Sequence, residues 1–187
     1  MESQFVSPYE GDLLGDLDFN FPEGTHAIGR LDKHSEGLLL LTTNKKITAL
    51  LFQSKVPHKR TYLVQVKHVV TPEALAKIRT GISIRIRGGE FYTTPECDVN
   101  IVERPEKYSP TENEANFQLK STWLTITLTE GKYHQVRKMV SAIRHKCVRL
   151  IRTSIEDLEL GDLPQGKIRE MNEDDFFRLL KLGEVKK

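Results

Sequence analysis

Apolar and polar residues alternate over two stretches of the chain. Residues 60–66 (RTYLVQV) place Tyr62 and two valines on one face. Residues 122–129 (TWLTITLT) place their leucines and isoleucine on one face and their threonines on the other. Side chains of a β-strand point alternately to opposite faces, so this period of two predicts two strands with one face in the core. Residues 82–92 (ISIRIRGGEFY) predict a strand, a Gly-Gly turn and a second strand.

Other apolar residues are grouped differently. Gly37 and the four leucines that follow it form a short unbroken apolar run, which is typical of a strand buried on both faces. Helical spacing appears in four further places, at Ile47, Leu50 and Leu51, after Pro72, over residues 133–144, and around Phe176, Phe177, Leu179 and Leu180.

Capping residues bound three of these four helices. Asn44 caps a helix that runs through Phe52, and Asn172 caps a last helix that Gly183 closes. Thr71-Pro72 opens another helix, and Gly81 ends it. Strands outnumber helices and their connections are short. We therefore expect an α+β fold with a mixed, largely antiparallel sheet flanked by helices.

Composition places the chain among globular proteins, and its charge is segregated. The 187 residues carry a net charge of +2, but residues 1–29 hold six acids and no Lys or Arg. Residues 42–72 hold six Lys or Arg and no acid, and residues 131–152 hold seven and no acid. If the fold brings these two basic segments together they form one positive surface for a polyanion; the alternative is two solvated helix faces.

Several classes of protein lack support. No apolar run reaches the length of a membrane span, and the first residues do not have the form of a signal peptide. Cys97 and Cys147 have no metal or redox spacing, so we expect reduced packing residues and a cytoplasmic protein. His26, His34 and His58 lie at no recognised metal spacing. No Walker loop, GxGxxG or serine elbow is present, so we expect no cofactor.

Three residues are candidates for chemistry, each with a plainer alternative. Asp32 precedes a predicted buried strand, as catalytic carboxylates often do, or it braces a turn beside Arg30. Tyr62 lies on a strand and is either a core aromatic or an active-site group. Arg137 lies on a predicted helix, where a solvated surface position is the ordinary role.

Five motifs in order carry a resemblance to a known family. They are GRLDKHSEGLLLLTTN (29–44), KRTYLVQV (59–66), EGKYHQVRKM (130–139), RLIRTSI (149–155) and LGDLPQGKIREM (160–171). Together they resemble the RsuA/RluB/RluE/RluF family of RNA pseudouridine synthases, over about residues 21–171. Within that family the chain most resembles the E-type branch, which modifies large-subunit ribosomal RNA.

The resemblance implies a reaction and roles for the three candidates. The family breaks the glycosidic bond of a uridine, turns the uracil and rejoins it through carbon. Asp32 is then the carboxylate near ribose C1′ or uracil C6, either as a nucleophile that adds covalently or as a group that stabilises and deprotonates the sugar. Tyr62 packs on the base and removes the C5 proton, and Arg137 pairs with the Asp. Leu150 walls the uracil pocket, and further substrate contacts fall on Arg30, Leu31, Lys59, His134, Gln135 and Lys138.

The family also implies an organisation for residues 1–187. We expect a single catalytic domain of two intimate subdomains with a central cleft, acting as a monomer on ribosomal RNA. Only 28 residues precede Gly29, so we expect no N-terminal domain of the S4 type. The first strand of the family would fall before Ser3, and residues 103–118, rich in Pro, Glu and Asn, predict a surface loop.

Two other functions stay open from the residues alone. The first is a catalytically idle RNA-binding or ribosome-assembly protein, although such a protein has no need for Asp32, Tyr62 and Arg137 together. The second is a glycosidase, which would need a second acid such as Glu36 across a sugar from Asp32.

Overall fold

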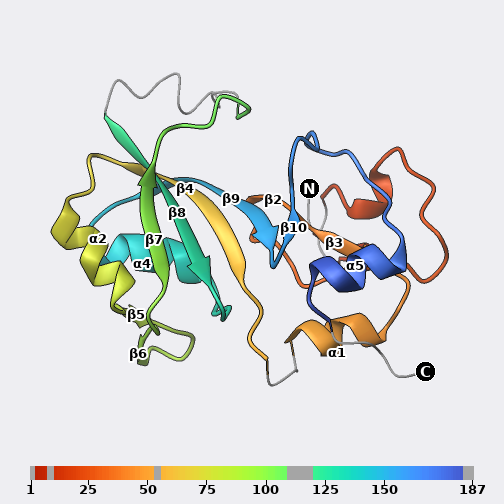
Figure 1. Cartoon of the computed structure of the whole chain (residues 1–187), viewed down its shortest axis with the longest axis horizontal. Coiled ribbons are helices and arrows are strands. Elements are labelled where there is room, and N and C mark those ends of the chain that lie inside the picture. The colour runs from red at the N-terminus through yellow and green to blue at the C-terminus, as the bar shows by residue number, and fades with distance from the viewer. Residues whose placement is uncertain (1–2, 8–10, 53–55, 109–119, 183–187) are drawn as a thin grey trace. The chain divides into compact units, whose positions relative to one another are not determined.

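The computed structural model describes residues 3–7, 11–52, 56–108 and 120–182 (Figure 1). The chain divides into two compact units. Unit 1 comprises residues 1–58 and 152–187, and unit 2 comprises residues 59–151. Each unit is described by itself below.

Long strands form the sheet of unit 2. They are β4 (Arg60–Lys67), β7 (Asp98–Val102), β8 (Ser121–Leu128) and the first part of β9 (Cys147–Ile155), in the order β9-β4-β8-β7. β4 and β8 pair antiparallel along their whole length, with Tyr62 opposite Ile126. β7 pairs antiparallel with the other edge of β8. The two strands predicted from alternation are confirmed.

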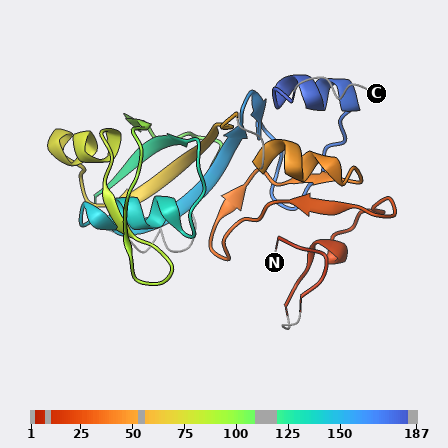
Figure 2. The ribbon, with the colours of Figure 1, turned by 90° about the horizontal axis from the view of Figure 1, so that it is seen from below.

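Two helices and a hairpin cover one face of this sheet. They are α2 (Pro72–Arg79), α4 (Gln135–Ala142) and the antiparallel pair β5 (Ser83–Arg85) and β6 (Phe91–Thr93) (Figure 2). Thr71 caps α2 through a bond from the Ala74 N–H, and Gly81 follows its end at φ +102°. Apolar side chains from these elements and from the sheet form one core cluster, which includes Val64, Val66, Ile78, Ile84, Val99, Leu124, Ile126, Leu128, Val136, Met139, Val140 and Leu150.

Strict alternation is wrong for the outer faces of β4 and β8. Leu63 and Gln65 are buried as well as Val64 and Val66, so β4 has both faces covered. Thr122 is also buried, against the expectation that every threonine faces solvent. Its hydroxyl donates to the carbonyl of His68 at 2.8 Å and accepts from the Val70 N–H at 3.0 Å. A buried hydroxyl with two partners costs little, so burial is tolerated there.

Unit 1 is built from shorter elements. They are the 3-10 turn η1 (Leu14–Asp16), β1 (His26–Ile28), β2 (Glu36–Gly37), β3 (Leu40–Thr42), α1 (Lys46–Phe52), β10 (Leu158–Glu159) and α5 (Glu173–Leu179). β1 and β3 pair antiparallel, and β10 pairs antiparallel with the end of β9. β2 also pairs with β9.

The leucine run is not one strand buried on both faces. β2 ends at Gly37, β3 begins at Leu40, and Leu38 and Leu40 are buried while Leu39 and Leu41 are half-buried. Gly37, at the head of the run, adopts φ +104° where its backbone meets that of Arg152. A side chain at this position would overlap the Arg152 backbone.

Helix starts follow the predictions more closely than helix ends. The Lys46 N–H donates to the Asn44 side chain at 3.0 Å, and the Asp175 N–H donates to Asn172 at 2.8 Å, so both caps are confirmed. α5 ends at Leu179 and is followed by Lys181 at φ +54°; Gly183, the predicted end, lies outside the described residues.

The third predicted helix, over residues 133–144, is shorter than expected. α4 begins at Gln135 because His134 has φ +54°, and it ends at Ala142, two residues before Arg144 at φ +64°. The Val136, Met139 and Val140 side chains are buried as predicted.

The mixed α+β fold is confirmed, and the pairs β1–β3, β4–β8, β5–β6, β7–β8 and β9–β10 are antiparallel. Of the predicted loop at 103–118, residues 103–108 contain no helix or strand and the remainder lies outside the described residues. Among the described helices, none combines the length and the apolar character needed to cross a membrane.

Candidate active site

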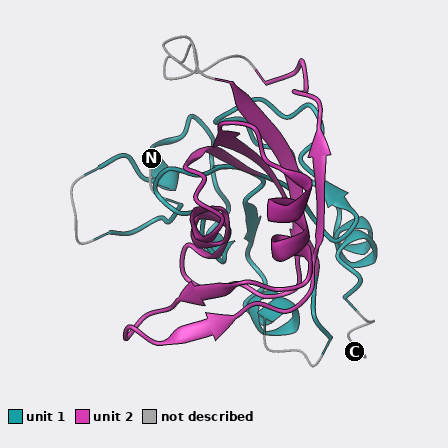
Figure 3. Cartoon of the chain, turned by 90° about the vertical axis from the view of Figure 1, so that its left-hand side faces the viewer, with its two compact units in different colours: residues 1–58, 152–187 teal, residues 59–151 magenta. Residues whose placement is uncertain are grey.

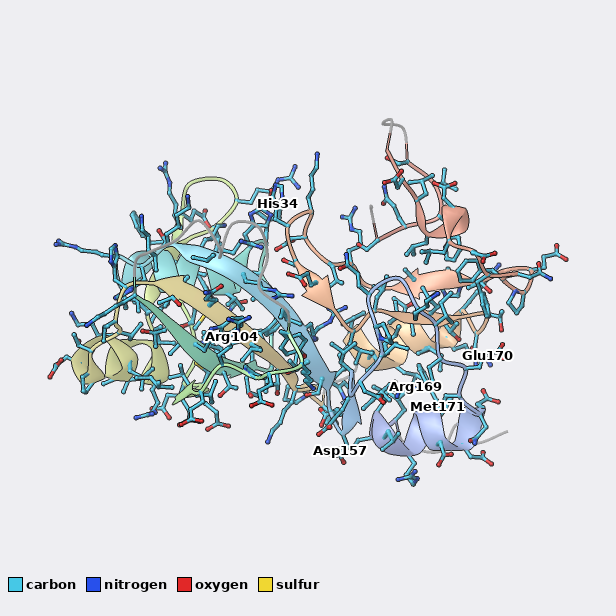
Figure 4. The ribbon with its side chains drawn as sticks, turned by 90° about the horizontal axis from the view of Figure 1, so that it is seen from above. His34, Arg104, Asp157, Arg169, Glu170 and Met171 are labelled. Atoms are coloured by element: carbon cyan, nitrogen blue, oxygen red, sulfur yellow. The ribbon has the colours of Figure 1, made fainter. Side chains whose placement is uncertain are left out.

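Asp32 lies in unit 1 on the loop between β1 and β2. Its side chain is half-buried, and the Ser35 N–H donates to the Asp32 carbonyl at 2.8 Å, which closes a turn. His34 lies on the same loop, ahead of β2 (Figure 4). Asp32 lies in a loop, as predicted, but the strand that follows, β2, is two half-buried residues and not the predicted buried strand.

Ser3 holds the residue that precedes Asp32. The Leu31 N–H donates to Ser3 Oγ at 2.9 Å, and the Ser3 hydroxyl donates to the Leu31 carbonyl at 3.0 Å. The Ser3 hydroxyl therefore pairs with both the N–H and the carbonyl of Leu31. Two residues further on, the Phe5 ring packs edge-on against Phe21 at a centroid distance of 4.9 Å. The pattern analysis missed Ser3, because no local signal links it to a loop 28 positions away.

Arg152 holds the other end of the Asp32 loop. The Leu38 N–H donates to the Arg152 carbonyl, and Arg152 Nε donates to the Leu38 carbonyl, both at 2.8 Å. The Arg152 side chain is only 5% exposed. Together with the close approach at Gly37, these bonds fix where the loop rejoins the strands of unit 1.

Tyr62 and Leu150 both contribute to the core of unit 2. Tyr62 is half-buried on β4 and packs against the core cluster that also contains Leu150, on β9. Leu150 is 4% exposed. The tyrosine is thus partly a core residue, as the plainer alternative had it, and its half-buried side chain leaves part of its surface open.

Arg137 is the third residue of α4, in its first turn, and is half-buried. Its charge acts on Cys147 of β9, where burial raises the pKa of the thiol and the guanidinium partly opposes this. Cys147 and Tyr62 both pack against the core cluster, so Arg137 lies at the side of that cluster where β9 begins.

Both cysteines are packing residues, as predicted. Cys97 is a free thiol that donates to the Ile78 carbonyl, and burial raises its pKa to about 11. Such thiols remain protonated near neutral pH and are poor nucleophiles.

A carboxylate that pattern reasoning missed organises the turn before α4. Glu130 Oε2 accepts from the Tyr92 hydroxyl at 2.6 Å, and Glu130 Oε1 accepts from Gln135 Nε2 at 2.5 Å. The Gln135 side-chain oxygen in turn accepts from the Lys132 N–H at 2.7 Å. The Tyr92–Glu130 bond raises the pKa of Tyr92. Gln135 is 4% exposed and shapes this turn, while its direct contact with RNA stays a prediction.

The remaining predicted contact residues differ in exposure. Arg30 and Lys59 are exposed, and Leu31, His134 and Lys138 are half-buried. Glu36, the second acid of the glycosidase alternative, is half-buried in β2. Within the described part of the chain no group of three or more His, Cys, Asp or Glu could hold a metal ion. His58 is buried, with its Nδ1 3.3 Å from Glu156 Oε1.

The predicted site residues therefore form two sets (Figure 3). Arg30, Leu31 and Asp32 belong to unit 1, on one loop. Lys59, Tyr62, His134, Gln135, Arg137, Lys138 and Leu150 belong to unit 2. Within unit 2, Tyr62 and Leu150 share a core and the four motif residues of 134–138 share one helix start.

Comparison with known proteins identifies the class first. A crystal structure described as that of a pseudouridylate synthase matches with a TM-score of 0.70 and 28% identity, over 86% of this chain and 63% of the other. The chain thus has the α+β fold of a pseudouridylate synthase. The family described as RNA pseudouridylate synthase matches residues 16–142, more than half of the sequence. The chain belongs to this family.

Two of the curated relatives of this chain carry the same name. Ribosomal large subunit pseudouridine synthase E of Vibrio parahaemolyticus is 37% identical over 149 residues, which cover 78% of this chain and 60% of the relative. The protein of the same name from Xanthomonas axonopodis is 30% identical over 148 residues, 78% of this chain and 75% of the relative. The chain spans about 60% of the length of the Vibrio parahaemolyticus relative.

Proposed function

We propose that this protein isomerises a uridine of large-subunit ribosomal RNA to pseudouridine. The observation that carries the proposal is the family match over residues 16–142, which includes Asp32, Tyr62 and Arg137. The names of the Vibrio and Xanthomonas relatives support the large-subunit RNA as substrate. The two acid-free basic segments fit a polyanionic substrate, because Lys and Arg neutralise phosphates and release their counterions.

The proposed reaction balances without any redox partner. The bond from ribose C1′ to uracil N1 breaks, the uracil turns, and a bond from C1′ to C5 forms. The C5 proton is then lost and N1 gains one, so substrate and product are isomers. Asp32 supplies the negative charge at the sugar or at C6, and the fixed backbone of Leu31 holds that carboxylate in place.

Residues of unit 2 take the other roles in the proposal. Tyr62 packs on the uracil and receives the C5 proton, and Leu150 forms an apolar wall for the base. Arg137 supplies the positive charge that keeps the Asp32 carboxylate ionised when an extruded base displaces water. The half-buried state of Tyr62 and Arg137 is compatible with these roles, because part of each residue remains accessible.

Tritium release from unmodified large-subunit rRNA labelled at uridine C5 tests the proposal. Wild type should release tritium, and Asp32→Asn should lower the rate at least about 1,000-fold, because it removes the charge while keeping the shape. Glu36→Gln is the matched control, an acid four positions later at the start of β2, and it should keep most of the rate.

The possible results separate the candidate functions. Wild-type binding without tritium release would favour the idle RNA-binding protein. Full activity in Asp32→Asn would contradict the catalytic assignment. Loss in both variants would mean that Glu36 also takes part in turnover, whereas a glycosidase, which breaks no C5–H bond, would release no tritium even as wild type.

A further inference from the structure

The turn that leads into α4 carries two stacked aromatic rings. The Tyr133 and His134 rings lie 3.9 Å apart between centroids, with an angle of 17° between their planes. Tyr133 remains 66% exposed in spite of this contact. Lys138 Nζ lies 5.3 Å from the centroid of the Tyr133 ring. The result is a stacked pair of rings with a cation over the Tyr133 ring.

The Glu130 network holds the base of this turn. Its carboxylate joins the Tyr92 hydroxyl on β6 to the Gln135 side chain at the start of α4, and Gln135 accepts from the backbone of Lys132. Lys132 Nζ lies 4.8 Å from the centroid of the Tyr92 ring. The backbone on both sides of Tyr133 is therefore fixed before any ligand arrives.

His134 adopts a backbone conformation that few side chains accept. Its φ is +54°, in the left-handed region, and this residue directly precedes the first residue of α4. Residues other than glycine are disfavoured in the left-handed region, so His134 keeps this conformation only where surrounding contacts hold it. The stack with Tyr133 and the network at Gln135 supply those contacts on either side of His134.

The chemistry of the surface indicates its ligand. Glu130 is the last acid before residues 131–152, which hold seven Lys or Arg. Proteins that bind single-stranded nucleic acid combine such cations, which follow the backbone phosphates, with aromatic rings on which bases stack. An apolar protein partner would gain little from the surrounding positive charge.

We propose that the Tyr133–His134 pair is a stacking platform for an unpaired base of the RNA, other than the uridine that is modified. Lys138 then contacts the phosphate of the stacked nucleotide. The platform rests on the proposed function, since it requires that the chain binds RNA. It assigns Tyr133 a role in choosing a substrate with an unpaired base at one defined position.

The test compares three single variants with wild type in binding to an unmodified large-subunit rRNA transcript. Tyr133→Ala should lower the affinity about 10-fold, since one stacked base is lost. Tyr133→Phe keeps the ring and should stay within about twofold of wild type. Phe91→Ala is the matched control, because Phe91 is an aromatic residue of the same unit with 78% exposure, on β6.

Salt dependence separates stacking from phosphate contact. Tyr133→Ala removes no charge, so the slope of log affinity against log salt should match wild type. Lys138→Ala should reduce that slope by about 1. In tritium release, Tyr133→Ala should raise KM by the same factor as the loss in affinity.

The possible results separate failure of the stacking platform from failure of the proposed function. If wild type binds RNA and releases tritium while Tyr133→Ala binds within twofold of it, the platform is wrong and the proposed function stands. Equal losses in Tyr133→Ala and Phe91→Ala would also reject the platform. If wild type neither binds RNA nor releases tritium, the proposed function fails and the platform with it.

Discussion

The two units of the chain are held together by different kinds of contact. In unit 2, β4 and β8 pair over eight residues each, and apolar side chains from the sheet, α2, α4 and the hairpin share one core. In unit 1, β1, β2, β3 and β10 are two or three residues long. The contacts that hold the loop carrying Asp32 include two hydrogen bonds with Ser3 and two with Arg152.

This difference predicts that the stability of the fold and the position of the Asp32 loop depend on different contacts. A shared core spreads the effect of any one contact over many neighbours, whereas a loop held by a few bonds depends on each of them. We therefore expect core substitutions in unit 2 to affect mainly unfolding, and substitutions at the loop contacts of unit 1 to affect mainly turnover.

The largest effect on stability should come from Leu124→Ala in the centre of β8. Leu124 is fully buried and belongs to the shared core, so its truncation should lower the free energy of unfolding by about 4 kcal/mol. Leu40→Ala, on the three-residue strand β3 of unit 1, should cost about 2 kcal/mol, because short elements can close a cavity more readily. Urea denaturation measures both, and equal costs would remove the contrast between the units.

Gly37→Ala tests the crossing of β2 and β9 and should cost about 3 kcal/mol. It adds strain at φ +104° and overlap with the Arg152 backbone. Gly24→Ala is the control, with φ +80° but nothing within 4 Å of an added Cβ, and it should cost about 1 kcal/mol. The same denaturation experiment reports the difference, which isolates the overlap; a difference near zero would show that the backbones can separate freely.

Ser3→Ala should affect turnover more than stability. Losing the two bonds to Leu31 should cost about 1 kcal/mol, yet it frees the residue next to Asp32, so kcat for tritium release should fall about 10-fold. Ser3→Thr keeps the hydroxyl and should restore most of the rate. Affinity for rRNA should change little in either variant. A fall in affinity with kcat unchanged would mean that Ser3 serves binding instead.

Tyr92→Phe should give the smallest effect, visible only at high pH. The bond to Glu130 raises the pKa of Tyr92 above its ordinary value of 10.0, so the folded protein holds this proton more tightly than the unfolded chain. The resulting stabilisation is present below pH 10 and is lost as the pH rises through the raised pKa. Wild type should therefore lose more stability than Tyr92→Phe in that range.

Denaturation of both proteins at pH 8 and above pH 10 measures this difference. Cys97, with a pKa of about 11, titrates in the same range but equally in both proteins, so the comparison cancels it. A constant difference between the two proteins at all pH values would rule out the linkage.

Patterns within a few residues of each other were predictable from the sequence. Alternation identified β4 and β8, Gly88-Gly89 identified a hairpin, and Asn44 and Asn172 marked helix starts. In each case the physical cause is local, either a strand period or a side chain that bonds to a backbone N–H two or three residues on. The position of Asp32 in a loop was predictable for the same reason.

Features that depend on distant partners were not predictable. The backbone of Gly37 meets that of Arg152, and the buried Thr122 hydroxyl bonds to the backbone of His68 and Val70. The Ser3 contact to Leu31 joins residues 28 apart, and Glu130 meets Tyr92 across 38. None of these pairs leaves a periodic trace in the sequence. The family resemblance supplied roles for Asp32, Tyr62 and Arg137, but the contacts that hold the loop and the turn came from the structure.

The path of β9 has a consequence for how the chain is made. Unit 2 is one continuous segment, whereas unit 1 is split between residues 1–58 and 152–187. The Lys67 N–H donates to the Lys146 carbonyl, so the end of β4 lies beside the start of β9. The start of β4, where the chain enters unit 2, therefore lies beside the later part of β9, where it leaves. On a ribosome, the Asp32 loop therefore emerges early but waits for Arg152, its late-translated partner. We expect the continuous unit 2 to fold first, and the Asp32 loop to reach its final contacts only after Arg152 has left the ribosome.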